Sequence, residues 1–416
     1  MPRAHGDFGI IAASFAAVLI VAASSQLLPA NLTTIAGDFA WQRGRLVATV
    51  HSAVGFTFAL TVLLWGALNE RWDHKWVFWI ALLFACAGAL ASALASRAWM
   101  IVAGGALIAA STAGVETTVT TLMGELRPRK RALFINLSQA MFAIGAGGSP
   151  FAVVWLLNRG FSWPMTFVAA AAAVAGLLVL LPLARSRPAQ RRAEPLQLRR
   201  ALGLMTQPRF TLLVATISFY VGIEIGVSAL SPQYFEEVWR IPTSDLWAKL
   251  PISAFWLAMV PGRVLAGALA CRLGEPKVAC GALLLGALSQ SLFLTATGPT
   301  AGLLWIAVSG FALGGVWPTV LSSVSLFYRE FIPTRLALLI GAGGAAIAVF
   351  EAFLGLLYDF ASATSRRNGI FITFCVIPAF AVVALLSYIL FLRAARRGDA
   401  SPEELSAPLQ QTAPTL

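Results

Sequence analysis

The chain has 416 residues, of which 58% are hydrophobic and only 12% are charged, and its formal net charge at pH 7 is +12. A mean hydropathy of +0.79 is too high for a soluble globular protein of this length. The composition therefore excludes a soluble domain and predicts an integral membrane protein.

Apolar stretches of about 20 residues, the length that crosses a bilayer, follow one another along the whole chain. They cover 8–29, 45–68, 76–95, 99–122, 132–157, 163–184, 210–230, 246–270, 278–296, 301–326, 336–358 and 370–392. The first stretch has neither a strongly basic start nor a clear cleavage site, so we expect it to remain as the first span and not to be removed as a signal peptide.

These stretches predict an all-α integral membrane protein with twelve transmembrane helices, arranged as two pseudo-symmetric six-helix bundles. We expect an N-terminal bundle over 1–184, a basic linker over 185–209, a C-terminal bundle over 210–392 and a disordered tail over 393–416. Nothing of domain size lies outside the predicted spans, so the function must be performed within or between helices.

The basic residues are distributed unevenly between the two sides of the membrane. With the N-terminus and the even-numbered loops assigned to one side, that side carries 21 of the 30 lysines and arginines and the other side carries 8. The positive-inside rule then places both termini and the linker in the cytoplasm, as in a multi-pass protein of the bacterial inner membrane. We interpret the arginines of the linker as a topology anchor on anionic lipid, and we expect no nucleic-acid partner.

No motif predicts a cofactor, a metal ion or an enzymatic reaction. Cys86, Cys271, Cys280 and Cys375 lack the spacing of metal ligands and are interpreted as small packing residues. The chain has no Gly-rich phosphate loop ending in Lys and Ser or Thr, which disfavours transport driven by ATP.

The two halves of the chain are related by an internal repeat. Gly66–Lys75, between the second and third predicted spans, matches Gly267–Lys277. An offset of 201 residues places Gly66 on Gly267 and Arg71 on Arg272, and the same offset places Glu116 on Trp317. Parallel six-helix repeats of this kind enclose a substrate site near the middle of the membrane, between the halves.

With this repeat, the chain resembles the major facilitator superfamily of transporters over essentially its whole length. The motif that carries the resemblance is a glycine, an acid and an arginine followed by a basic residue after the second span. In that superfamily the motif forms a cytoplasmic latch that closes when the substrate site faces outward. The resemblance assigns this role to Gly66, Glu70, Arg71 and Lys75, and in the second copy to Arg263, Gly267, Arg272 and Lys277. Cys271 stands where the second copy would have its acid.

Three stretches resemble the fucose permease-like branch of proton-coupled symporters more narrowly. They are 114–145, 219–226 and 314–319. The branch also carries an acid in its first span, and the best-matching position here holds Gln26. If that alignment is right, coupling through two carboxylates of the first and fourth spans is unavailable, and Glu116 must act alone or with Glu224.

Glu116 is the residue that the predicted membrane position makes hardest to explain without a function. An ionised carboxylate inside a bilayer is costly and is normally paired, protonated or turned toward a water-filled cavity. Thr112, Glu116 and Thr120 share one face of the fourth predicted span, because residues four apart lie one above another on a helix. We therefore predict that Glu116 is the proton-coupling residue.

Further polar residues of the spans are candidates for the same site. Asn136 and Gln139 form a pair of amides suited to hydroxyl-rich ligands, and Tyr220, Glu224 and Ser228 repeat the four-residue spacing on the seventh span. The predicted proton-coupling residues are Glu116, Glu224 and Glu351. The predicted substrate-binding residues are Gln26, Thr112, Thr120, Asn136, Gln139, Tyr220, Ser228, Trp317 and Thr319. Their alternative role is packing between helices through hydrogen bonds.

Two further residues, Glu351 and His51, each have two possible roles that the sequence does not separate. Glu351 matches no motif, so it either pairs with a neighbour or titrates as a second proton site. His51 either relays protons or is a structural residue near the end of its span.

The sequence thus predicts a secondary transporter that works by alternating access and takes up a small polar solute, such as a sugar, together with protons. Its expected partners are the solute, protons and the lipid bilayer, with no obligate protein partner and no cofactor. Uncoupled passage remains open. Proton-driven efflux of drugs or metabolites is the main alternative, because 145–150 faintly resembles an antiporter motif and the chain is rich in Trp and Phe. A membrane sensor is disfavoured, because no extramembrane module is visible.

Overall fold

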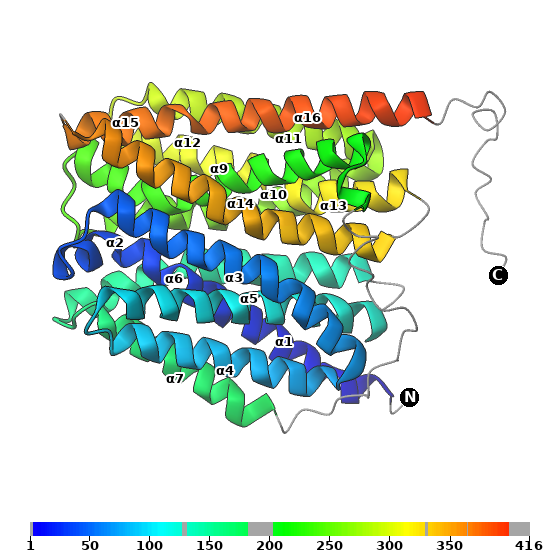
Figure 1. Ribbon diagram of the computed structural model, residues 1–416, viewed down its shortest axis with the longest axis horizontal. Helices are drawn as coiled ribbons and strands as arrows, with labels where there is room; N and C mark the ends of the chain where they lie inside the picture. The colour runs from blue at the N-terminus through cyan, green and yellow to red at the C-terminus, as the bar shows by residue number, and fades with distance from the viewer. Residues whose placement is uncertain (1–2, 127–130, 182–202, 329–331, 364, 399–416) are drawn as a thin grey trace.

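The computed structural model describes residues 3–126, 131–181, 203–328, 332–363 and 365–398, and within these ranges the regular structure is helical (Figure 1). The first half of the chain forms α1 (Arg3–Ser25), α2 (Leu27–Asp38), α3 (Arg43–Arg71), α4 (His74–Ala93), α5 (Ala98–Leu126), α6 (Arg131–Asn158) and α7 (Pro164–Leu180). The second half forms α9 (Pro208–Val238), α10 (Leu246–Leu273), α11 (Glu275–Leu294), α12 (Pro299–Leu313), α13 (Val316–Phe327), α14 (Ile332–Ala361), α15 (Arg366–Cys375) and α16 (Ile377–Gly398).

The helices account for the predicted membrane spans. Among the described residues, 11 helical segments are long and apolar enough to cross a membrane, and α7 is a shorter apolar helix in the place of the sixth predicted span. This confirms the all-α membrane fold. Most of the predicted linker, 185–202, and most of the predicted tail, 399–416, lie outside the described residues.

Three of the spans are each built from two consecutive helices, and a proline explains each interruption. A helical carbonyl accepts a hydrogen bond from the N–H four residues later, which proline lacks. Pro29, Pro318 and Pro378 follow the breaks between α1 and α2, α12 and α13, and α15 and α16. Backbone groups freed in this way inside a membrane protein need another partner.

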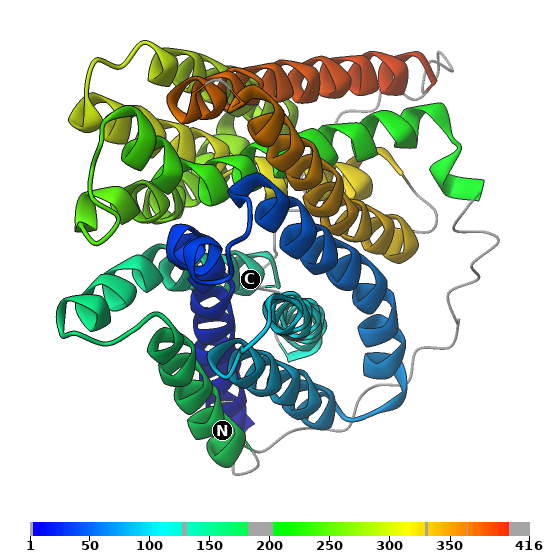
Figure 2. The same ribbon diagram turned by 60° about the vertical axis from the view of Figure 1, so that its left-hand side comes forward.

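The helices pack as two halves, α1–α7 and α9–α16, which we call the N half and the C half (Figure 1). Figure 2 shows α3 and α14 side by side between them, and α6 and α10 form the second contact across the boundary. The first and last described residues lie at the same end of the bundle, which we call the termini side. The opposite end, where α2 leads into α3 and α14 leads into α15, is the far side.

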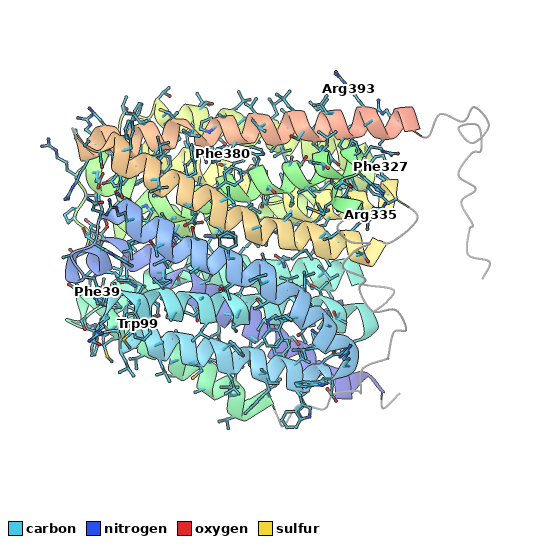
Figure 3. The ribbon with its side chains drawn as sticks, in the orientation of Figure 1. Phe39, Trp99, Phe327, Arg335, Phe380 and Arg393 are labelled. Atoms are coloured by element: carbon cyan, nitrogen blue, oxygen red, sulfur yellow. The ribbon has the colours of Figure 1, made fainter. Side chains whose placement is uncertain are left out.

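Large side chains mark these two sides in Figure 3, where Phe39 and Trp99 lie toward the far side and Arg335 and Arg393 toward the termini side. Arg335 lies 4.1 Å from the centre of the Tyr328 ring and donates to Gln207 Oε1 at 3.1 Å. These contacts join the start of α14 to the end of α13 and to the residue that precedes α9.

Glycines permit the close approach of α10 and α12. A side chain at Gly262 would overlap the backbone of Phe311, and one at Gly310 would overlap the backbone of Phe255. Small residues at helix contacts let two backbones touch inside a membrane, where no hydrophobic effect drives the helices together. This contact fixes α10, and with it Arg263, against the break between α12 and α13.

We predict that Gly262→Ala destabilises the protein, because the added methyl group has to displace the Phe311 backbone. Overpacking of this kind costs about 1–3 kcal/mol. The matched control is Gly267→Ala on the same helix, where a methyl group would meet nothing within 4 Å. The unfolding temperature in detergent should fall for the first variant and stay equal or rise for the second; an equal effect of both would contradict this packing.

Candidate functional site

Four polar side chains meet in the middle of the bundle. Glu116 comes from α5 of the N half, Tyr220 and Glu224 from α9, and Arg263 from α10 of the C half; each carboxylate interacts electrostatically with the arginine. Glu224 and Arg263 are 9% and 7% exposed, and Glu116 is partly buried. We call these four residues the central charge cluster.

The position of Arg263 follows from the proline break in the tenth span. Pro318 has no N–H to donate to the carbonyl of Gly314, four residues earlier. The Nε of Arg263 donates to that carbonyl at 3.2 Å, and its Nη1 donates to the backbone oxygen of Gln139 on α6. The guanidinium therefore joins the C half to the N half, while its charge faces the two glutamates.

Aromatic rings line one side of the cluster. The Tyr220 and Trp317 ring centroids are 6.4 Å apart, and Trp317 lies against Gly343 of α14, where a side chain would meet the indole at 3.0 Å. Trp317 occupies the repeat position of Glu116. The pseudo-symmetric halves thus place an acid on one side of the site and an indole on the other.

The remaining predicted substrate residues have different surroundings. Gln26 lies at the break between α1 and α2, and its Oε1 and the Ser228 Oγ are buried without a hydrogen-bond partner among the described residues. Thr112 and Thr319 donate to backbone carbonyls of their own helices, at 2.9 and 2.5 Å. Thr120 and Gln139 are partly buried, whereas Asn136, near the start of α6, is exposed.

Glu351 lies outside the central charge cluster. It is 2% exposed on α14, and its Oε2 faces the Nδ1 of His51, which is 6% exposed on α3 of the other half. The structure therefore gives Glu351 a partner in the neighbouring helix, one of the two interpretations that the sequence left open.

The predicted latch residues lie at the termini side of α3, α4, α10 and α11. Arg71, Arg272 and Lys277 are exposed there, and the side chain of Glu70 lies outside the described residues. Arg263 departs from the prediction that grouped it with this latch. Its guanidinium is buried in the central charge cluster, because the free Gly314 carbonyl and the two glutamates lie there.

Sequence reasoning missed two polar contacts that hold the helices in place. Near the latch, the Asn69 amide donates to Thr118 at 3.0 Å and its oxygen lies 2.9 Å from His74 Nδ1. At the far side, Glu236 accepts from Thr33 of the N half at 2.7 Å and from Lys249 at 3.3 Å. A lysine inside the eighth predicted span was the available signal for the second contact.

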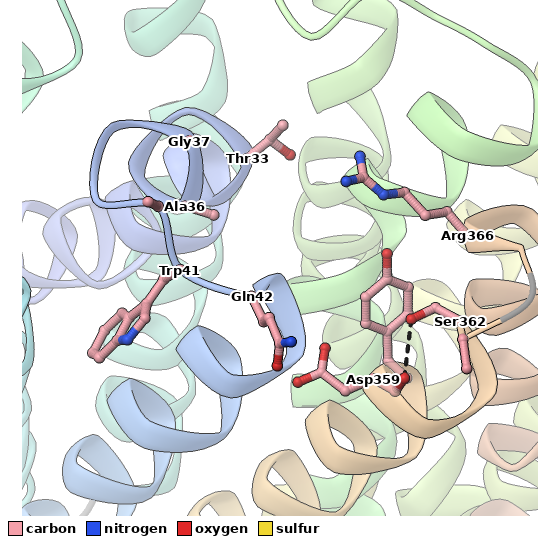
Figure 4. Close-up of a pocket in the computed structure, with 11 residues that line it drawn as sticks. Thr33, Ala36, Gly37, Trp41, Gln42, Asp359, Ser362 and Arg366 are labelled. Atoms are coloured by element: carbon pink, nitrogen blue, oxygen red, sulfur yellow. Dashed lines mark hydrogen bonds between the residues drawn. The ribbon is translucent and has the colours of Figure 1, made fainter.

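The far side also carries a cavity of about 480 Å³ between the halves (Figure 4). Its walls combine α2 and the α2–α3 connection with the end of α14 and the start of α15. The polar residues that line it are Thr33, Gln42, Tyr358, Asp359, Ser362 and Arg366.

The net charge of the central charge cluster depends on whether one of its two glutamates holds a proton. Arginine stays protonated, so one ionised glutamate balances it and a second one leaves a net charge of −1. A single proton on either Glu116 or Glu224 makes the cluster neutral. Because a net charge is costly in a buried site, the electrostatic balance of the cluster depends on this proton.

Comparisons with known proteins agree with this architecture. The sequence profile of the Major Facilitator Superfamily matches residues 13–248, and the chain belongs to that family. It is therefore a membrane transporter and not an enzyme.

Solved transporters share the fold at low sequence identity. A bacterial homolog of the human lysosomal transporter Spinster, in an inward-facing and unoccupied conformation, is 13% identical with a TM-score of 0.77, covering 96% of this chain and 99% of that one. A nucleoside transporter is 13% identical with a TM-score of 0.72, covering 91% and 99%. A peptide transporter is 16% identical with a TM-score of 0.71, covering 93% and 94%.

One curated relative is similar over part of its length. The rubrofusarin-specific efflux pump aurT of Gibberella zeae is 26% identical over 178 residues, which are 42% of this chain and 32% of the pump. The match thus spans about a third of that pump.

We predict that Arg263→Gln destabilises the protein, because it leaves two buried carboxylates without their cation. A buried charge that is left without compensation is destabilising. Adding Glu224→Gln should restore part of the loss, and Arg272→Gln, an exposed position of the same helix, should have little effect. Unfolding temperatures in detergent measure all three; a stable single variant would show that Arg263 does not balance the glutamates.

Proposed function

We propose that the protein is a proton-coupled secondary transporter that takes up a small polar solute by alternating access. The observation that carries the proposal is the central charge cluster, which joins Glu116 of the N half to Glu224 and Arg263 of the C half. Such a cluster lies where the two halves must move relative to each other during transport.

Proton coupling follows from the charge balance of the cluster. Glu116 takes a proton on one side of the membrane and loses it on the other, and Glu224 pairs with Arg263 while Glu116 is neutral. The contact of Arg263 to the backbone of Gln139 crosses to the N half and so depends on the relative position of the halves, whereas its contact to Gly314 lies within the C half. Rocking of the halves therefore changes how strongly the arginine is held near the glutamates, and with it their affinity for protons.

The distribution of basic residues supports an orientation of the protein in the membrane. The positive-inside pattern puts the termini side in the cytoplasm, so the far side is external. Contacts such as the bond from Thr33 to Glu236 join the halves on the far side. We infer that the structure represents a state in which the two halves are joined on the far side.

A polar solute is supported by buried polar groups that have no partner among the described residues. Gln26 Oε1 and Ser228 Oγ have unsatisfied hydrogen-bonding capacity among the described residues, and Gln139 adds a partly buried amide. Amides and hydroxyls both donate and accept, which suits a solute with several hydroxyl groups, such as a sugar. Trp317, which is partly buried, can offer a ring face to its apolar side, whereas the Tyr220 ring is fully enclosed in this state.

The decisive experiment is transport into proteoliposomes with a panel of labelled sugars, sugar acids and cationic drugs. We expect proton-driven accumulation to collapse in Glu116→Gln while solute exchange across the membrane survives, because the amide keeps the shape of the site but cannot titrate.

Asp245→Asn is the matched control, because Asp245 is an exposed helix cap whose role asparagine also fulfils. It should transport like the wild type. Unchanged accumulation in Glu116→Gln would remove Glu116 as the coupling acid.

Proton-driven efflux is the second candidate, supported by the similarity to a fungal efflux pump over 178 residues. An antiporter would use the same cluster by exchanging protons for a cationic or aromatic compound. Cells that express an exporter should resist toxic compounds and accumulate less dye. Cells that express a symporter should accumulate the labelled solute, so the two measurements separate the candidates.

A further inference from the structure

Helices α3 and α14 form the longest contact between the halves, and the contact follows one face of each helix. We call it the α3–α14 seam. Its residues on α3 are Gly44, His51, Ser52 and Gly55, and those on α14 are Gly344, Ala348, Glu351, Gly355 and Asp359.

Glycines make the seam a contact between backbones. A side chain at Gly44 would overlap the backbone of Gly355, and one at Gly55 would overlap the backbone of Ala348. Helices that touch this closely cannot accommodate an inserted side chain or a water molecule. The seam therefore opens only if the two helices separate.

Polar contacts cross the seam at two levels besides His51 and Glu351. Asp359 Oδ1 accepts from the N–H of Gly44 at 3.0 Å and so caps α3, whose own N-cap residue Gln42 provides no side-chain bond. Ser52 Oγ donates to the carbonyl of Ala348 at 3.2 Å. All of these residues lie in the parts of α3 and α14 that lead to the far side.

The His51–Glu351 pair is the ionisable contact buried deepest in the seam. Both side chains are more than nine-tenths buried, and they belong to opposite halves. A buried charge that loses its partner is strongly destabilising, whereas a hydrogen-bonded pair that is neutral overall is tolerated. The closed seam therefore requires the pair to hold one proton in total, on whichever of the two side chains it resides.

We propose that His51 and Glu351 form a proton-dependent lock that holds the far side closed, separate from the proton exchange at the central charge cluster. Opening the far side separates α3 from α14 and exposes both side chains to water.

Proton counting gives the direction of the effect. In water a histidine and a glutamate titrate near their ordinary pKa values of about 6.5 and 4.3. The open seam then holds one proton between these values, none above about 6.5 and two below about 4.3. Above pH of about 6.5 closing takes up one proton, so lower pH favours the closed state by up to about tenfold per pH unit.

Other titratable groups on the helices packed against the pair belong to other contacts. Glu116 and Glu224 face Arg263, and Glu237 accepts from Tyr358 at 2.8 Å nearer the far end. In the described part of the chain these helices also carry Asp38, Arg45, Arg71, His74, Lys75, Cys86, Arg209, Tyr220, Tyr234, Glu236, Arg335, Asp359, Arg366, Arg367 and Cys375.

The test measures the distance between the halves at the far side without any solute. Spin labels at Ser162→Cys and Thr297→Cys, exposed positions in the connections α6–α7 and α11–α12, report far-side opening by pulsed electron resonance in nanodiscs. The four native cysteines are replaced first. We expect two distances, a short one from the closed state and a long one from the open state. The ratio of the closed population to the open population should fall as pH rises from 6.5 to 8.5, by up to about tenfold per pH unit.

Glu351→Gln should remove this pH dependence, because the histidine that remains is neutral in both states above pH of about 6.5. His51→Gln should keep it, because the buried carboxyl of Glu351 then has to take up a proton of its own when the seam closes. The exchange His51→Glu with Glu351→His keeps one acid and one base in the seam and should also keep it. Ser52→Ala, which removes a neighbouring bond across the seam but no titrating group, should keep the slope. An unchanged slope in Glu351→Gln, or a far-side distance that does not respond to pH in the wild type, would overturn the lock. Because the measurement needs neither solute nor transport, its failure leaves the proposed function in place, and loss of transport in Glu116→Gln leaves the lock in place.

Discussion

A charge that is buried in a membrane protein has to be balanced by a partner inside the protein, and this constraint organises the structure. Among the described residues, several buried ionisable groups lie at the boundary between the two halves, where helices of different bundles can supply partners. Glu116 faces Glu224 and Arg263, His51 faces Glu351, and Glu236 lies between Thr33 and Lys249. Relative movement of the halves therefore alters each of these balances.

The backbone meets the same constraint, because a free carbonyl in the membrane also needs a donor. Pro318 removes the helical donor of Gly314, and Arg263 replaces it. A residue that interrupts one helix thus positions the cation of another. Gly262 and Gly310 permit this contact by letting the two backbones approach. The Trp-Pro-Thr stretch of the tenth span consequently contributes the ring of Trp317 to the centre of the bundle, and its proline frees the carbonyl of Gly314 there.

The contacts between the halves divide into two groups with different physical character. The central charge cluster combines one cation with two acids, so its net charge depends on a proton. The α3–α14 seam is a dry backbone contact that holds one acid and one base. We infer that the central charge cluster couples solute transport to protons. We also infer that the α3–α14 seam makes closure of the far side depend on pH. In alternating access, each of these two sets of contacts is open to water in one state of the transporter and closed in the other.

Much of the fold could be predicted from sequence. Apolar stretches predicted the spans, since a helix that satisfies its own backbone is the structure that a bilayer allows, and the repeat predicted two related halves. Glu116 and Glu224 stood out for the same reason, because ionisable residues are rare in such stretches. Their roles, like those of the other candidate residues, stay predictions.

Contacts between helices far apart in sequence were decided by the tertiary structure alone. Arg263 follows a Pro-Gly pair near a basic loop, so its sequence neighbours point to the latch, whereas its partners Gly314 and Gln139 lie on other helices. His51 and Glu351 are separated by 300 positions and share no motif, yet they face each other across the seam. The sequence by itself determined which residues are costly to bury. Only the packing of the two halves determined which of them meet, because the spacing of residues along one helix carries no information about the helix that packs against it.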